Sequence, residues 1–520
     1  MTALMEQVVA VPTRRVVAEI ARFEARRLWR HPALIGAVAV TAYELYQRSD
    51  LSGAPVLNRL SYQLAWPMLL LAGGIYLALG NAASRRHGEH NLEGLDALPT
   101  VAATNSVGVG LAFVSPLLVG VALQMGFLVP RLFDRPVTWM IWTEFLTGPA
   151  TLALGAAAGL AMGWGLRWRG ALPVFGVGVV AVITTLWWAE SGTLFGPYTP
   201  WLGPVPGLDS TYGALEASHR PSDFHLGYVL ALAGFFAALA SIRGRRVSGK
   251  LALSGAAIAM LLLAAWAGTT QLRELTSVEE ATRRAPYLPA SGDYVCEERG
   301  TLTLCAYHGY EAWIDEWAAQ IEPVLALVPP EVAGRPLEVR QQVTYFVDED
   351  VLPQEGDIRT GLWLSRAPVD AALIPYPLNL SLAVAAWSVG LPTGTESPCF
   401  ASGQGRAVAA LWYAIQASPE SAEGLRILVD PAPYRRPVSE NFPVPLGYLQ
   451  PAFGVRYLRS DAEAALAIAR LPQPQVAETL AQRFSEVTDP ATTGEEVAAW
   501  FGISWPRLTP WDDTEDQVCR

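Results

Sequence analysis

Seven apolar stretches in the first half of the chain constrain its fold more than any other feature of the sequence. They lie at residues 32–47, 61–82, 104–130, 145–166, 171–189, 225–243 and 251–270. Each approaches or exceeds the roughly 20 residues that a helix needs to cross a bilayer, and the shortest can still span when their ends tilt or snorkel. The sequence therefore predicts a polytopic α-helical membrane domain of six spans plus a seventh.

Clusters of arginine give these spans a direction. They precede the first span and follow the second, fourth and sixth, at Arg14, Arg15, Arg22, Arg26, Arg27, Arg30, Arg85, Arg86, Arg167, Arg169, Arg243, Arg245 and Arg246, with Lys250 beside the last. Arg131 and Arg135, after the third span, are the main exception. Because cytoplasmic flanks are enriched in Lys and Arg, an odd number of spans places residues 271–520 outside the cell.

The charge balance differs between the two halves of the chain. Residues 1–270 carry 19 basic and 14 acidic side chains, whereas residues 271–520 carry 18 and 34, a net charge of −16. Nucleic-acid binding needs clustered positive charge, so no nucleic-acid partner is expected. Lys250 is the only lysine among abundant Arg, Ala, Gly and Pro, a composition that indicates a bacterial source and hence a bacterial cell membrane.

All four cysteines, Cys296, Cys305, Cys399 and Cys519, lie beyond the last apolar stretch. An oxidising exterior permits disulfides, so their position agrees with the orientation that the arginines give. Cys296 and Cys305 flank Arg299-Gly300, which suits the two arms of a hairpin, and this pairing leaves Cys399 for Cys519. Four cysteines allow three connectivities, and the sequence alone does not choose among them.

Residues 13–30 predict an amphipathic helix on the membrane surface. Its apolar side is formed by Val17, Ile20, Ala21, Leu28 and Trp29. The opposite side faces anionic headgroups or water, which makes membrane lipid an expected partner, and it includes Arg22, Arg26, Arg27 and Arg30. A plain positively charged flank of the first span is the alternative.

A short charged segment, 84–100, lies between the second and third spans. Its leucines recur every three residues, at Leu92, Leu95 and Leu98, before Pro99, so they form one face of a short helix. An apolar ridge on a short cytoplasmic helix is best explained as a surface that another protein receives. The alternative is a helix packed against the inner ends of the spans.

This order of elements resembles the permease subunits of ABC exporters of the type-2 exporter superfamily over about residues 14–246. In that family an amphipathic elbow helix precedes the spans, and a short cytoplasmic coupling helix enters a separate ATP-binding subunit. The resemblance implies a coupling helix made of Glu89, Leu92, Glu93, Leu95, Asp96, Leu98 and Pro99. It also implies a cytoplasmic ATPase partner that holds ATP and Mg, and a second copy of the permease. The seventh span and the large outer region depart from the simplest members.

The predicted organisation follows from these features. An elbow helix occupies residues 1–31, a six-span permease domain 32–246, the seventh span 247–270 and an extracytoplasmic domain 271–520. Gly155, Gly159 and Gly163 place small residues on one face of the fourth span, which lets helices approach closely in lipid. Charged residues are scarce at the span centres, which favours a conduit powered from elsewhere with an apolar or amphiphilic cargo.

Residues 271–520 predict an α+β domain. Leu337–Val347 alternates as a strand should, and helical patterns occur at about 310–327, 379–389, 402–417, 419–428, 461–470, 474–486 and 494–501. This order faintly resembles the gluzincin metallopeptidases. The candidate zinc-binding helix, 378–389, has neither His nor Glu, and His308 is the only histidine of this half, so we expect no metal site and a degenerate peptidase-like fold at most.

Catalytic motifs are otherwise weak. Gly244–Lys250 has phosphate-loop spacing, but Leu251 stands where Ser or Thr would hold magnesium, and no strand precedes the segment. We therefore expect no cofactor and no catalysis in this chain. The expected function is that of an ABC permease, and the alternative is a membrane-anchored receptor or scaffold with a ligand-binding outer domain.

Overall fold

The computed structural model describes residues 13–47, 57–88, 107–133, 136, 139–165, 173, 174, 176, 202–204, 221–242, 247–284, 294–342, 358–361, 376–392, 399–401, 403–429, 448–449, 455–505 and 519. The chain divides into two compact units. The helical unit runs to Ala281, and the C-terminal unit runs from Thr282 to Arg520 and also counts residues 52–54.

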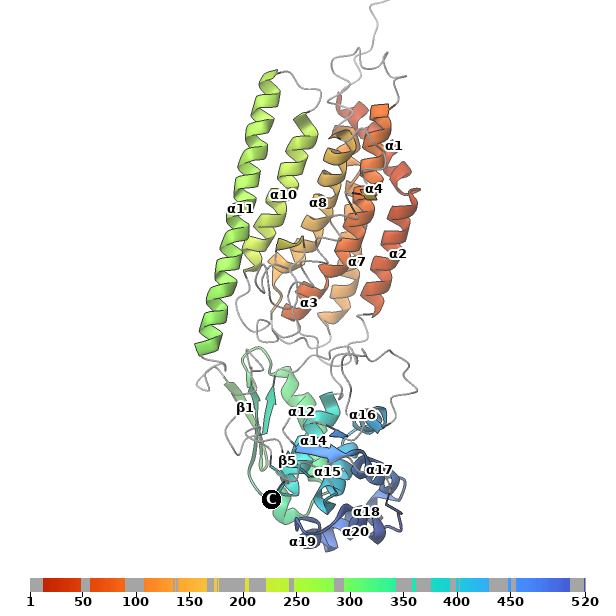
Figure 1. The fold of residues 1–520 in the computed structure, drawn as a ribbon, viewed down its shortest axis with the longest axis vertical. Helices are drawn as coiled ribbons and strands as arrows, with labels where there is room; N and C mark the ends of the chain where they lie inside the picture. Colours follow the sequence, from red (N-terminus) through yellow and green to blue (C-terminus); the bar gives the residue numbers. More distant parts are fainter. Residues whose placement is uncertain are drawn as a thin grey trace, which may run out of the picture. The chain divides into compact units, whose positions relative to one another are not determined.

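The helical unit (Figure 1) is built from α1 (Thr13–Leu28), α2 (Pro32–Gln47), α3 (Leu57–Gln63), α4 (Trp66–Gly88), α7 (Val114–Arg131), α8 (Trp142–Gly165), α10 (Ser222–Ile242) and α11 (Val247–Arg284). Pro32 begins α2, because proline at the first helical position has no amide hydrogen to leave unpaired. The corner between α1 and α2 therefore falls between Leu28 and Pro32.

Among the described residues, five helices are long and apolar enough to cross a membrane. They are Trp66–Ser84, Val107–Arg131, Trp142–Gly165, Ser222–Ile242 and Gly249–Leu275. The apolar helix Pro32–Tyr46 is shorter, and the expected span 171–189 lies outside the described residues except at 173, 174 and 176. The helices suggest a membrane protein, while the count of six spans plus a seventh stays a prediction.

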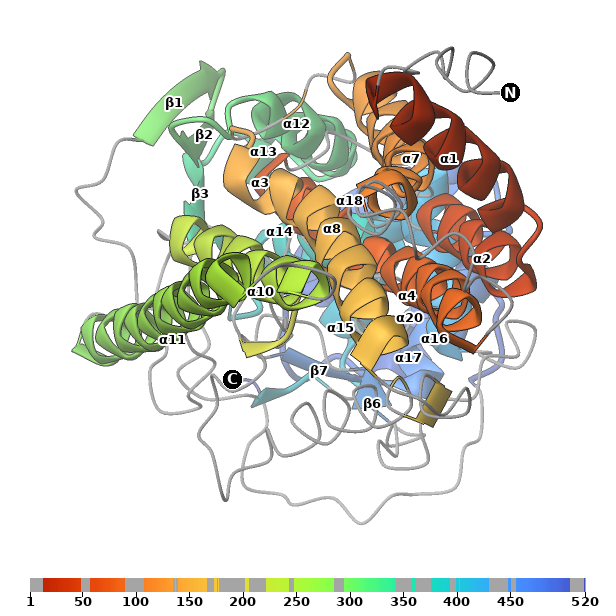
Figure 2. The same cartoon turned by 90° about the horizontal axis from the view of Figure 1, so that it is seen from above.

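α8 lies between α4 and α10 and packs against both, as Figure 2 shows. On the other side of α4 lies α2, which contributes Leu34 to the core. Leu71, Ile75 and Leu79 of α4 and Leu152 of α8 are each at most 1% exposed. α4 is therefore the central helix of this core, which explains why few of its side chains face outward.

α11 is a single helix of 38 residues, about 57 Å long at 1.5 Å per residue. It continues to Arg284, beyond residue 270, the predicted end of the seventh span. Its described buried residues form one stripe, Ala257, Ala264, Ala267, Gly268, Gln271 and Leu275, whereas Leu251, Ile258 and Leu262 are at least 60% exposed. Spacings of three, four and seven residues keep a stripe on one helix face, so α11 packs through that face alone.

The C-terminal unit begins with a four-stranded sheet in the order β1-β2-β3-β4. Its strands are β1 (Tyr294–Arg299), β2 (Leu302–Tyr307), β3 (Leu337–Gln342) and β4 (Ile358–Gly361). β1 and β2 form an antiparallel hairpin, whereas β2, β3 and β4 run parallel. A parallel pair needs a crossover connection, which α12 (Ala312–Leu325) and α13 (Pro330–Ala333) supply. α12 packs on β2 and buries Trp313, Trp317 and Ile321.

Helices and a second small sheet complete this unit. They are α14 (Tyr376–Ser388), β5 (Cys399–Phe400), α15 (Gly405–Ile415), α16 (Pro419–Val429), β6 (Tyr448–Leu449), β7 (Val455–Leu458), α17 (Arg459–Ile468), α18 (Gln473–Gln482), α19 (Phe484–Val487) and α20 (Gly494–Trp500). The small sheet has the order β5-β7-β6. Every residue of α15 is buried, because α14, α16, α17 and α20 pack around it. The α+β class and the predicted helices of this half are thus present.

Candidate functional site

The predicted coupling segment lies outside the described residues. Glu89, Leu92, Glu93, Leu95, Asp96, Leu98 and Pro99 follow directly after α4, which ends at Gly88. Their role as an ATPase contact therefore stays a prediction. The structure does describe the contacts of α4, the helix that directly precedes these residues.

The expected elbow helix is α1, and its two sides separate as the sequence predicts. Leu28 is 3% exposed and Ile20 is half-buried. A methyl group added at Gly108 would lie 2.6 Å from Ile20 Cγ2, so α1 packs closely on the segment that precedes α7. Arg22, Arg26, Arg27 and Arg30 are all exposed, which leaves the basic side open to water or headgroups.

Polar contacts fix the corner after α1. Trp29 Nε1 donates to Ser115 Oγ at 3.1 Å, and the Nε2 atom of His31 lies 3.2 Å from Asn81 Nδ2 of α4. Glu24, on the inner side of α1, is only 2% exposed. His31 thus attaches the elbow to Asn81, seven residues before α4 ends, a contact that was not predicted from the sequence.

The glycine face of α8 contacts the backbone of α4. A methyl group added at Gly155 would lie 2.5 Å from the carbonyl oxygen of Ala72, and one at Gly159 would lie 2.5 Å from that of Tyr76. At Gly163 it would collide with the carbonyl oxygen of Gly80. The three glycines therefore have the helix-packing role that their spacing predicts.

A second group of buried polar side chains lies where α8 and α10 begin. Ser222 Oγ donates to Glu144 Oε1 at 2.8 Å, and His225 Nδ1 lies 3.2 Å from Gln271 Oε1. All four are at most 4% exposed. We call Glu144, Ser222, His225 and Gln271 the α10 polar cluster. It connects α8, α10 and α11, because buried polar groups in an apolar setting require partners.

The described residues contain no group of three or more His, Cys, Asp or Glu side chains that could hold a metal ion. The helix that corresponds to the candidate peptidase helix, α14, contains no His, Cys, Asp or Glu, and its Ser381 and Ser388 donate to backbone carbonyls of Leu378 and Ala385. These hydroxyls are satisfied within their own helix, so α14 serves as core.

Two disulfides join Cys296 to Cys305 and Cys399 to Cys519, the pairs expected from the sequence. Cys296 and Cys305 are direct partners across the β1–β2 hairpin, with 4.1 Å between their Cα atoms. Cys399 and Cys519 are 120 residues apart in the chain. The second bridge therefore ties the last described residue of the chain to β5.

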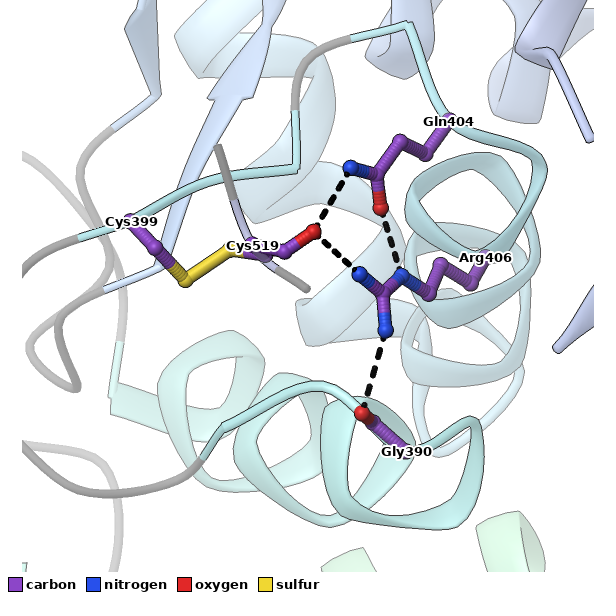
Figure 3. The surroundings of a disulfide bond; sticks show 5 residues. All are labelled: Gly390, Cys399, Gln404, Arg406 and Cys519. Carbon is purple, nitrogen blue, oxygen red and sulfur yellow. Dashed lines mark hydrogen bonds between the residues drawn. A yellow bond between two sulfur atoms is a disulfide. The ribbon is translucent and has the colours of Figure 1, made fainter. Parts of the chain in front are cut away.

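A buried arginine, Arg406, contacts Cys519 of the second disulfide (Figure 3). Arg406 is 2% exposed, and it donates through Nη2 to the carbonyl oxygen of Cys519 at 2.5 Å. Its Nη1 donates to the carbonyl of Gly390 at 3.3 Å and its Nε to Gln404 Oε1 at 2.5 Å, while Gln404 Nε2 donates to Cys519 at 3.0 Å. Burial lowers the pKa of the Arg406 guanidinium. Hydrogen bonds on all three nitrogens compensate for the water that this cation has lost.

A buried carboxylate lies at the N-terminus of α17. Asp461 is 0% exposed and accepts backbone N–H bonds from Leu458 at 2.8 Å and from Gly403 at 3.1 Å. Burial raises the pKa of Asp461 to about 7, although both backbone bonds act to lower it. Arg406 and Asp461 are thus held separately, each by its own main-chain partners.

Arg406 and Asp461 were not predicted from the sequence, but each left a signal there. Arg406 is the only charged residue in the apolar helix Gly405–Ile415, and a charge at such a position requires buried partners. Asp461 is the third residue of its helix, where an acid caps the start of the helix. The α10 polar cluster left no comparable signal, since its members lie up to 127 residues apart.

No protein-family model matches the chain, and no curated protein or solved structure is significantly similar to it. The described residues show the class of protein only in outline: membrane-length apolar helices are followed by a disulfide-bonded α+β unit.

Proposed function

We propose that this chain is the permease subunit of an ABC exporter, driven by a separate cytoplasmic subunit that binds and hydrolyses ATP with Mg²⁺. Two copies form the transport pathway, because one six-span unit is half of a symmetric conduit. The cargo is an apolar or amphiphilic compound. The observation that carries the proposal is the elbow helix α1 attached to α4, the helix that leads into the segment 89–99.

The packing of α4 supports a coupling role for the segment that follows it. α4 contacts α8 backbone to backbone at Gly155 and Gly159, and it contacts the elbow through Asn81. A contact without intervening side chains cannot absorb a displacement by a change of rotamer. A push on residues 89–99 by an ATPase would therefore move α4 and α8 together.

The polar groups of the helical unit support an apolar or amphiphilic cargo. Glu144, a buried acid of α8, accepts from Ser222 at 2.8 Å near the start of both helices. Ion-coupled carriers place ionisable groups at the midplane of their spans, whereas this carboxylate lies in the first turn of α8. Energy from ATP hydrolysis in a partner fits this arrangement better than an ion gradient.

The proposed orientation places the C-terminal unit outside a bacterial cell membrane. Both disulfides belong to that unit, and stable disulfides belong to oxidising compartments. The arginine-rich segments then face the cytoplasm, together with the segment 89–99.

The second candidate is a membrane-anchored receptor or scaffold. It is favoured by the C-terminal unit, which has its own buried core around α15 and two disulfides. The two candidates differ in their cytoplasmic partner, since only the permease requires an ATPase.

A pair of substitutions in the coupling segment tests the proposal. Leu95→Asp places a charge on the apolar ridge, where burial without a partner is strongly unfavourable, so we expect the ATPase to be lost when the tagged chain is purified from its native membrane. Ala97→Asp adds the same charge to the same segment but off the ridge, and it should retain the ATPase. Equal retention by both variants would refute the coupling role and favour the receptor.

A further inference from the structure

Asp461 lies where three separate segments of the C-terminal unit meet. Its carboxylate accepts from Leu458, at the junction of β7 and α17, and from Gly403, in the turn before α15. The turn is itself bonded to the segment before α20, because Gly494 N donates to the carbonyl of Gly403 at 2.6 Å and Gly405 N donates to that of Thr492 at 2.8 Å. We call the contact of these three segments the Asp461 junction.

Glycine is required at two places in the junction. Gly403 has a φ of 71°, in the left-handed region. A methyl group at Gly405 would lie 2.7 Å from Val497 Cγ2 of α20. The segments therefore approach too closely to admit water, and the carboxylate between them is 0% exposed.

The junction accepts the carboxyl group in both of its protonation states. Asp461 Oδ2 lies 2.8 Å from Leu458 N and 3.3 Å from Gly403 N, so this one oxygen reaches both donors. A proton on Oδ1 leaves both backbone bonds possible. The ionised form makes these bonds stronger, but it also buries a full charge.

Few nearby charges offset the free-energy cost of burying the ionised Asp461 carboxylate. Tyr457, on the adjoining strand, is fully buried, and burial together with the carboxylate raises its own pKa. Arg459 and Glu463 of α17 pair with each other at 2.8 Å. The described ionisable side chains of the other elements packed on α17 are Arg406 and Tyr413 of α15, Glu420, Glu423 and Arg426 of α16, and Glu495 and Glu496 of α20. No ion pair joins Asp461 to any of these residues.

We propose that Asp461 is a proton-operated latch, which holds the Asp461 junction closed when the carboxyl group is neutral and favours its opening when the group ionises. Opening gives the carboxylate access to water and releases the turn at Gly403–Gly405 before α15. The latch makes the C-terminal unit responsive to the pH of the compartment that it faces, whether or not the helical unit transports anything.

The direction of the effect follows from the pKa. In the folded unit the pKa of Asp461 is about 7, against 3.8 for the exposed group, so the folded state holds the proton more tightly. The latch is strongest in acid, and it weakens as the pH rises toward and through 7. Between pH 6 and pH 8 the ratio of closed to open junction should fall about ten-fold.

Amide hydrogen exchange of the full-length protein in lipid nanodiscs measures this ratio. Peptides that cover Gly403–Gly405 and 455–461 are followed at pH 6, 7 and 8, and the intrinsic pH dependence of exchange is divided out. After this division, the exchange rate of the wild type should still be about ten-fold higher at pH 8 than at pH 6, and we call this remaining increase the excess. No excess in the wild type overturns the latch, independently of how any variant folds.

Two variants assign the effect to Asp461. Asp461→Asn keeps an acceptor oxygen for both backbone donors but does not titrate, so its excess should disappear. Asp489→Asn is the matched control, because Asp489 also accepts a backbone N–H, from Ala491 at 2.9 Å, yet is exposed. The control should keep the wild-type excess. A wild-type excess that persists in Asp461→Asn assigns the titration to another group and rejects the proposal.

Discussion

Gly159→Ala tests the close packing of α8 on α4. The added methyl group would lie 2.5 Å from the carbonyl oxygen of Tyr76, and an ordinary contact begins at 3.4 Å. The two helices would therefore have to separate by about 0.9 Å along this contact, which weakens the dispersion contacts around it. Overpacking of this kind costs about 1–3 kcal/mol.

A matched glycine isolates that cost. Gly126 of α7 is exposed, and a methyl group there meets nothing within 4 Å. Both substitutions gain about 1 kcal/mol of helix propensity, so the difference between the two variants reports the overpacking alone. SDS-induced unfolding in mixed micelles, followed by circular dichroism, should find Gly159→Ala less stable than Gly126→Ala by about 1–3 kcal/mol. Equal stability of the two variants would refute the backbone contact.

Three further results are expected. Replacing Cys399 and Cys519 together by Ser should lower the free energy of unfolding of the C-terminal unit by about 2–5 kcal/mol, measured by denaturant titration, because a long loop is no longer closed in the unfolded chain. Arg406→Met should cost about 1–3 kcal/mol in the same titration, since it removes the guanidinium donor of the Gly390 carbonyl and of Gln404 Oε1, while the Cys519 carbonyl keeps Gln404 Nε2; an unchanged midpoint would contradict the role of Arg406. Single cysteines introduced at positions 245 and 450 should react with an impermeant thiol reagent in intact cells only at 450, and the reverse pattern would invert the orientation.

Features that depend on local pattern could be predicted from the sequence. The β1–β2 hairpin follows from Cys296 and Cys305 on either side of Arg299-Gly300, and the structure pairs the two cysteines directly. The glycine spacing in α8 predicted a close helix contact, although the partner helix was not identified. The extension of α11 to Arg284 was not predicted, because the apolar pattern ends near residue 270, although the sequence has no proline between there and Pro286.

Features that depend on distant partners could not be predicted. His225 meets Gln271 46 positions later in the chain, and Arg406 meets Cys519 113 positions later. In neither pair do the two residues belong to one periodic sequence pattern. The sheet β5-β7-β6 escaped prediction because β5 and β6 have two residues each, too few for an alternation of polar and apolar side chains to be recognised.

We propose that this chain works with an ATPase, and ATP turnover by the complex purified from its native membrane tests this proposal most directly. Tagged wild-type chain should carry a cytoplasmic subunit that hydrolyses ATP, and native mass spectrometry should find two copies of the chain in the complex. Leu95→Asp should reach the membrane in normal amount, yet it should be purified without that activity. A wild-type chain that is purified intact from its membrane with no ATP-hydrolysing subunit would contradict the account and leave the anchored receptor in its place.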